Sequence, residues 1–229
     1  MPAGIITAME VQKRNKQRVN VYLDDEYAFS LKLEEAARLH KGQHLTEAEV
    51  EALETQDTLA RAIDTAARFL SYRPRSIQEV RENLARKDTP PPVIEAAVEK
   101  LEALGYLSDL SFAAFWVRER NTFKPLSPRA LRHELRQKGV ADSIIDEVLA
   151  QIDADDAAYR AAYSQTRRLR NLSRREFENK LLQFLQRRGF GYRDAKTAIR
   201  RLIETLETEE NDYFRDNSDE DLSFPESDE

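Results

Sequence analysis

With 229 residues, of which 41% are hydrophobic and 34% charged, the chain can form one large domain or two small ones, and its helices should carry long solvated faces. Six glycines are few for a protein of sheets and turns, and the absence of cysteine excludes disulfides and thiolate zinc sites. No apolar run resembles a signal peptide or reaches membrane-spanning length, so a soluble, cytoplasmic protein is expected.

The net charge of −6 averages two regions of opposite sign. Residues 207–229 hold 11 acidic residues and one basic residue, a net −10, so the preceding 206 residues carry a net +4. Within them, residues 167–201 hold 12 basic residues against three acidic ones, a net +9. Such an uneven distribution indicates a polyanionic partner.

Residues 5–32 contain three runs in which apolar residues alternate with others, a period of two that indicates β-strands. In the first run the alternating residues are Ile5, Thr7, Met9 and Val11. We expect a three-stranded meander, about the smallest stable sheet. Its first connection is basic, and basic residues there either contact phosphates or keep an exposed sheet edge from aggregating. The candidates for phosphate contact are Lys13, Arg14, Lys16 and Arg18.

Two helices should follow the strands, a short one near residues 33–39 and another beginning at Thr46, where Glu49 completes a capping box. His40 and His44 are four residues apart, but Gly42 between them weakens any helix that would place both on one face. A metal site is therefore not expected there. We predict no catalytic, cofactor-binding or metal-ligating residues, and no cofactor.

The rest of the chain repeats one block three times. Each copy has a serine that can cap a helix and a leucine eight residues later, and the pairs are Ser76 with Leu84, Ser127 with Leu135, and Ser173 with Leu181. The starts are 51 and then 46 residues apart, close to the period of about 40–47 residues in some helical repeat arrays. The pattern predicts a mainly α-helical fold of tandem three-helix repeats stacked as a curved solenoid.

The predicted domains follow from these blocks. They are residues 1–45 (the meander with a short helix), 46–107 (a linker helix and repeat 1), 108–152 (repeat 2), 153–206 (repeat 3) and 207–229 (an acidic, disordered tail). The second helix of repeat 3 should be about one turn longer than that of repeat 2, because the distance from its serine to the next glycine is 16 residues instead of 12.

Repeat 3 carries the candidate binding residues. Either they face a polyanion or they form a solvated helix face that pairs with Glu176 and Glu178. The acidic tail could fold back on them and compete with the polyanion, or it could only add solubility. The candidate residues are Arg167, Arg168, Arg170, Arg174, Arg175, Lys180, Arg187, Arg188, Arg193, Lys196, Arg200 and Arg201.

Three short motifs resemble those of the RecX family of recombination regulators. They are Arg73-Pro74-Arg75-Ser76 followed by Glu79 and Leu84; Gly105-Tyr106-Leu107-Ser108-Asp109 followed by Phe112-Ala113; and Glu134-Leu135 followed by Lys138-Gly139-Val140. The resemblance covers residues 5–206 in the order of elements. The chain departs from the family pattern at Asp88, where a glycine is common, at residues 124–126, and in its long acidic tail.

This resemblance implies a protein without catalytic residues that binds the RecA recombinase along its filament on DNA and restrains filament growth, ATP hydrolysis and strand exchange. Direct DNA binding should be weak and salt-dependent, no membrane partner is expected, and the protein should be a monomer. The alternative is a DNA-binding module that acts without RecA. An enzyme is the least supported class, because there is no phosphate loop, no zinc-protease motif and no cysteine nucleophile.

Overall fold

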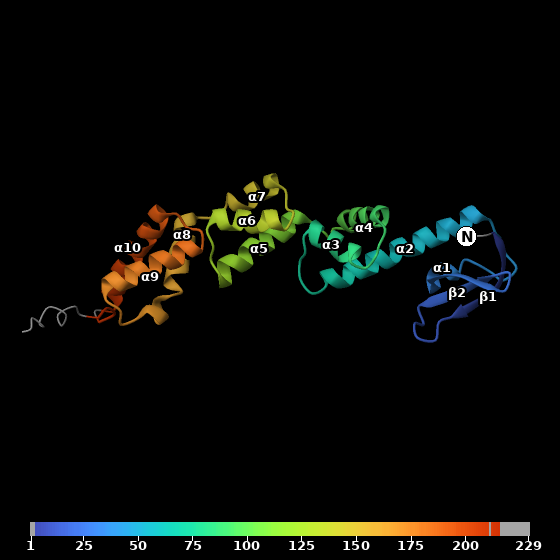
Figure 1. Ribbon diagram of the computed structural model, residues 1–229, viewed down its shortest axis with the longest axis horizontal. Helices are drawn as coiled ribbons and strands as arrows, with labels where there is room; N and C mark the ends of the chain where they lie inside the picture. Colours follow the sequence, from blue (N-terminus) through green and yellow to red (C-terminus); the bar gives the residue numbers. More distant parts are fainter. Residues whose placement is uncertain (1–2, 211, 216–229) are drawn as a thin grey trace, which may run out of the picture. The chain divides into compact units, whose positions relative to one another are not determined.

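The computed structural model describes residues 3–210 and 212–215, which divide into two compact units between Ser108 and Asp109. In this described part the strands lie in the first unit only and helices are the larger part of the regular structure in both units, as Figure 1 shows, which confirms the mainly helical fold class. None of the described helices is long and apolar enough to cross a membrane.

The first unit opens with an antiparallel sheet. Its strands are β1 (Gly4–Val11), β2 (Arg18–Leu23), β3 (Glu26–Lys32) and β4 (His44–Leu45), in the spatial order β3-β2-β1-β4. The predicted three-stranded meander is present, and β4 adds a fourth strand that pairs with the start of β1. Two residues are too few to show a period, so the sequence pattern could not indicate this strand.

The buried face of β1 differs from the face that alternation indicated. Ile6 is fully buried, whereas Ile5 is 46% exposed and Val11 is 48% exposed. The pairing between β1 and β2 shifts its register between Ile6 and Ala8. Because a shift of one residue exchanges the two faces of a strand, the run from Ile5 to Val11 does not mark the core side.

Two helices connect the sheet to the first repeat, α1 (Leu33–Ala36) and α2 (Glu47–Leu70). Thr46 caps α2 through the expected capping box with Glu49. The linker helix and the first helix of repeat 1 are therefore one helix of 24 residues. Its start packs on the sheet through Val50, and its end packs into the next core through Ala66.

Repeat 1 is completed by α3 (Ile77–Ala85) and α4 (Pro91–Ala103), and its core includes Val80 and Leu84. Ser76 caps α3 as predicted, and Glu79 completes a capping box with it. Asp88 has a φ of +57°, so it adopts the left-handed conformation that usually favours glycine. Asp88 therefore preserves the turn, although a glycine is common at this position in the family.

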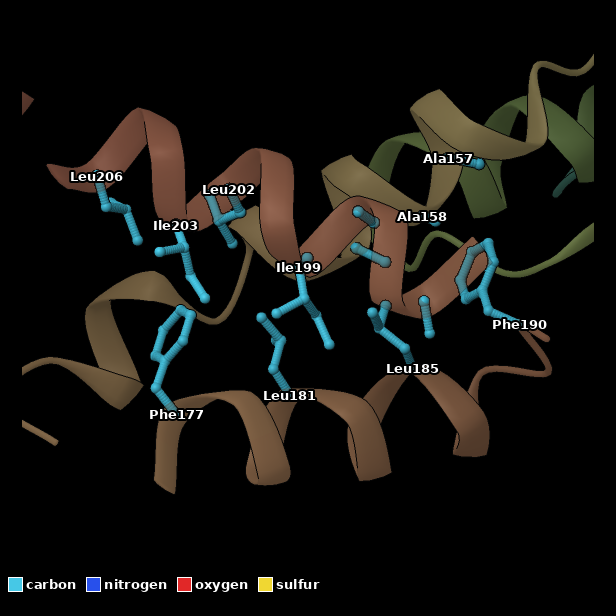
Figure 2. Close-up of a cluster of buried hydrophobic side chains, with 14 of the residues drawn as sticks. Ala157, Ala158, Phe177, Leu181, Leu185, Phe190, Ile199, Leu202, Ile203 and Leu206 are labelled. Carbon is cyan, nitrogen blue, oxygen red and sulfur yellow. The ribbon is translucent and has the colours of Figure 1, made fainter. Parts of the chain in front are cut away.

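The second unit contains two three-helix cores. Repeat 2 consists of α5 (Asp109–Phe123), α6 (Pro128–Gln137) and α7 (Asp142–Leu149); repeat 3 consists of α8 (Ala154–Tyr163), the 3₁₀ helix η1 (Thr166–Leu169), α9 (Arg174–Arg187) and α10 (Tyr192–Glu209). The 14 residues of α9 exceed the 10 residues of α6 by about one turn, as predicted. Figure 2 shows Phe177, Leu181 and Leu185 on α9 facing the apolar side of α10.

The ordered part of repeat 3 extends beyond Leu206. Helix α10 continues to Glu209, and Tyr213, which is 3% exposed, packs with Phe214 on the ring of Phe177. The expectation of disorder from residue 207 was therefore wrong for the described residues up to 215, because two adjacent aromatic side chains contribute apolar surface within the acidic stretch. The rest of the predicted tail, residues 216–229, lies outside the described residues.

Candidate nucleic-acid interface

Acidic partners hold three of the candidate cations of repeat 3. Arg170 pairs with Glu210 at 2.7 Å, Arg174 pairs with Glu207 at 2.9 Å, and Lys196 lies 3.7 Å from Glu178. All three basic side chains are more than a third exposed in these pairs. Because exposed ion pairs contribute little to stability, a polyanion could displace these carboxylates at low energetic cost.

The alternative that Glu176 and Glu178 neutralise the basic face holds only in part. Glu178 also lies 3.5 Å from Arg174. Glu176 instead accepts hydrogen bonds from the hydroxyl and the backbone N–H of Ser173, and these bonds lower the pKa of its carboxyl group. Glu176 is therefore the acidic member of the capping box of α9, in which Ser173 is the N-cap residue.

Five other candidates lie on the surface of repeat 3, outside these ion pairs. The guanidinium of Arg201 lies 4.4 Å from the ring centroid of Tyr159, an arrangement that holds a cation against an aromatic face. The side chains of the remaining four are exposed, and these residues are Arg167, Arg175, Arg193 and Arg200.

Four candidates come together in a groove of about 930 Å³ within the second unit. Arg168 reaches it from η1, and Lys180, Arg187 and Arg188 reach it from α9 and its C-terminal cap. Lys124, between α5 and α6, is a fifth cation in its lining and was not among the predicted residues. We call this site the basic groove. It is built from both repeats of the unit.

The described lining of the basic groove includes one carboxylate, Glu134. Its Oε2 atom accepts hydrogen bonds from the indole N–H of Trp116 at 2.8 Å and from Nε of Arg120 at 2.7 Å. Glu134 is therefore already neutralised by Arg120. The five cations that line the groove consequently present a net positive charge to a ligand.

Arg188 is the most constrained of these cations. Its guanidinium lies 4.9 Å from the ring centroid of Phe184, and its buried Nη1 atom has no hydrogen-bond partner among the described residues. Burial, followed by the nearby charge of Arg120, lowers the pKa of Arg188. The fold thus holds a guanidinium that is partly desolvated and lacks a counter-ion in the described structure.

Contacts between repeats 2 and 3 position Arg188. The backbone N–H of Ser127, at the start of α6, donates a hydrogen bond of 3.1 Å to the carbonyl oxygen of Arg188. The next residue, Gly189, has a φ of +84°, and a Cβ atom there would lie 2.7 Å from Oγ of Ser127 and 2.9 Å from Cβ of Ala130. Only glycine allows this close approach of α6 to the end of α9.

The substitution Gly189→Ala should therefore destabilise the second unit by about 2–4 kcal/mol, from backbone strain together with overlap at Ser127 and Ala130. Gly105→Ala is the matched control, because Gly105 has a φ of +74° but no atom within 4 Å of an added Cβ. It should cost only the strain, about 1–2 kcal/mol. Urea unfolding followed by circular dichroism measures both, and equal losses would contradict the close approach.

The secondary candidates in the turn between β1 and β2 have different environments. Lys13, Arg14 and Lys16 are exposed. Arg18 instead forms two hydrogen bonds with the buried carboxylate of Asp57, at 2.8 and 3.0 Å. Arg18 is thus a structural residue that joins the sheet to α2, and we remove it from the set of residues that could contact phosphate.

Family models match most of the chain. The RecX N-terminal domain matches residues 4–46, the first RecX three-helix domain matches residues 62–101, and the second matches residues 108–149. These spans include the sheet and the first two repeats, so the matched order agrees with the order of elements in the structure.

Curated relatives and solved structures carry the same family name. Regulatory protein RecX of Bacillus pumilus is 34% identical over 210 residues, which is 89% of this chain and 80% of that protein. Regulatory protein RecX of Bacillus subtilis is 34% identical over 82% of this chain and 73% of that protein. A crystal structure of regulatory protein RecX superposes with a TM-score of 0.65 at 32% identity, covering 88% of this chain and 99% of that one. RecX from Lactobacillus salivarius gives a TM-score of 0.56 at 26% identity over 65% of this chain and 99% of that one.

Proposed function

The chain belongs to the RecX family of regulatory proteins, and from this membership we propose that it binds the RecA recombinase on DNA in the cytoplasm and restrains growth of the RecA filament. ATP hydrolysis and strand exchange by RecA would fall as a consequence. The observation that carries the proposal is the basic groove, where five cations line one surface and the one lining carboxylate of the described part is already paired.

The geometry suits a regulator that acts by binding. Cations from η1, from α9 and from the chain between α5 and α6 line one groove, so a ligand there would contact both repeats of the second unit at once. Arginine serves this purpose, because its planar guanidinium pairs with either the phosphates of DNA or the carboxylates of a protein. The exposed pairs of Arg170 and Arg174 with Glu210 and Glu207 could open to enlarge the contact.

The test is ATP hydrolysis by RecA on single-stranded DNA, titrated with the protein. The unmodified chain should inhibit hydrolysis. The triple variant Arg168→Gln, Lys180→Gln, Arg187→Gln should need about tenfold more protein for the same inhibition, since it loses several charge-assisted contacts.

The matched control changes exposed cations of the first repeat, Arg86→Gln with Lys87→Gln, and should inhibit like the unmodified chain. A chain that leaves hydrolysis unchanged at saturating concentration would overturn the proposal. Equal inhibition by the triple variant would place the RecA contact on another surface.

A second candidate function is binding of DNA without RecA. The basic groove favours it, because its positive charge comes from this chain alone. The discriminating measurement is binding to DNA with and without RecA. Unchanged affinity on bare and RecA-coated DNA, together with normal RecA hydrolysis, would favour this second function.

A further inference from the structure

The basic groove contains a feature that a merely solvated charged face would not show. The Nη1 atom of Arg188 is buried, and it lacks a hydrogen-bond partner among the described residues. A buried polar group without a partner is unfavourable and uncommon in native proteins. On an ordinary solvated face, this side chain would extend into water.

Several contacts keep Arg188 in place. Its carbonyl oxygen is bound by the backbone N–H of Ser127, and Gly189 follows it in a conformation that lets α6 approach. The guanidinium lies over the ring of Phe184. The one nearby carboxylate in the described lining, Glu134, is occupied by Trp116 and Arg120. An anion that enters the groove would give the guanidinium of Arg188 a counter-ion and would offset its repulsion with the guanidinium of Arg120.

The surroundings indicate which anion fits. Arg168, Lys180, Arg187 and Lys124 approach from different segments, which suits a ligand with charges at several points along its length. The remaining lining includes the apolar side chains of Leu126, Leu169, Leu172 and Phe184. Apolar and aromatic side chains beside a cationic groove contact unstacked bases of a single strand, whereas a duplex keeps its bases stacked inside.

We propose that the basic groove binds single-stranded DNA, with a backbone phosphate on the guanidinium of Arg188 and an unstacked base against apolar side chains of the lining. This inference rests on the proposed function for its choice of DNA, since a regulator of RecA on DNA meets single strands. It adds a defined phosphate subsite made jointly by repeats 2 and 3.

The experiment measures the fluorescence anisotropy of a labelled oligothymidylate that is titrated with the full chain in the absence of RecA. A length of about 20 nucleotides exceeds the roughly 4–16 nucleotides that one OB fold, a single-strand binding domain, covers. Arg188→Gln should weaken binding about tenfold and should reduce the slope of log affinity against log salt by about 0.7. Arg188→Lys should keep the slope and lose part of the affinity, because lysine lacks the planar fork.

Arg86→Gln is the matched control, because Arg86 is the C-terminal cap residue of α3, as Arg188 is of α9, but its side chain is exposed and lies outside the groove. It should leave affinity unchanged. If Arg188→Gln does not fold, as judged by circular dichroism, the double variant Arg168→Gln, Lys180→Gln tests the same groove and should reduce the slope by about 1.4.

Two results would overturn the inference: equal affinity of the groove variants and the Arg86→Gln control, or equal affinity for a duplex of the same length. Inorganic phosphate should compete with the oligothymidylate only weakly, because it lacks the base and the neighbouring phosphates. The two proposals fail separately. If Arg188→Gln loses binding but the unmodified chain does not inhibit RecA hydrolysis, the phosphate subsite stands and the proposed function is wrong. If the unmodified chain inhibits RecA hydrolysis but Arg188→Gln binds the oligothymidylate normally, the proposed function stands and the subsite is wrong.

Discussion

Ending the chain after Leu206 should unfold the third repeat at urea concentrations where a chain that ends after Arg215 keeps it folded. The difference lies in Tyr213 and Phe214. Tyr213 is 3% exposed, its hydroxyl donates a hydrogen bond of 2.6 Å to the carbonyl oxygen of Thr166, and both rings pack edge-on against Phe177. Loss of a buried aromatic side chain costs about 3–5 kcal/mol, so the shorter chain should lose at least that much.

Two backbone bonds add to this anchor. The N–H of Asn171 donates to the carbonyl oxygen of Tyr213, and the N–H of Arg215 donates to that of Leu172. The single variant Tyr213→Ala in the full chain is the control, and it should reproduce most of the loss. Equal unfolding midpoints for the two shortened chains would show that the aromatic pair does not stabilise repeat 3.

The chain that ends after Arg215 also tests the role of the acidic tail. It lacks seven acidic residues and keeps the aromatic anchor, so any change in its DNA affinity reflects charge and not unfolding. If the tail competes with DNA, this chain should bind more tightly at low salt and equally at high salt. Unchanged affinity at low salt would leave the tail a role in solubility only.

Asp57→Ala should destabilise the first unit by about 3–5 kcal/mol, because it leaves the guanidinium of Arg18 partly buried without its counter-ion. Asp57 is 7% exposed and Arg18 is 15% exposed in this pair, and Arg18 also donates to the hydroxyl and the carbonyl oxygen of Ser30. Urea unfolding of the full chain, followed by circular dichroism, measures the loss.

The pair between Lys32 and Asp64 provides the control. It also joins the sheet to α2, at 2.7 Å, but Asp64 is 46% exposed. Asp64→Ala should therefore cost less than about 1 kcal/mol. The double variant Arg18→Met, Asp57→Leu should recover most of the stability, because it removes both buried charges. Equal losses at Asp57 and Asp64 would contradict the role of burial.

Local patterns could be read from the sequence because each depends on residues that are close along the chain. The predicted helix caps at Thr46, Ser76, Ser127 and Ser173 each join residues three apart, and all four are present. The greater length of α9 was predicted from the distance between Ser173 and the next glycine, Gly189. The register shift in β1 could not be predicted from local sequence, because the register depends on the pairing of β1 with β2 and not on the alternation within β1.

The basic segment shows the same division. Its composition predicted a cationic surface, but some partners of its side chains lie far away in the sequence. Arg174 pairs with Glu207, 33 residues on, and Arg18 pairs with Asp57, 39 residues on. Lys124 enters the basic groove from the neighbouring repeat, which no local pattern indicates.

The sequence by itself determined the three-helix repeats, their capped starts and the separation of positive and negative charge, since helix periodicity, capping and composition are properties of short segments. Only the tertiary structure decided which arginines are paired, that Arg188 has a buried nitrogen without an acceptor in the described structure, and that Tyr213 and Phe214 pack on repeat 3. Those outcomes depend on burial and on contacts between distant residues. Arg18 and Arg188 carry the same functional group, but Arg18 has a structural role and Arg188 is a candidate phosphate ligand. The reason is that Arg18 faces a buried carboxylate and Arg188 does not.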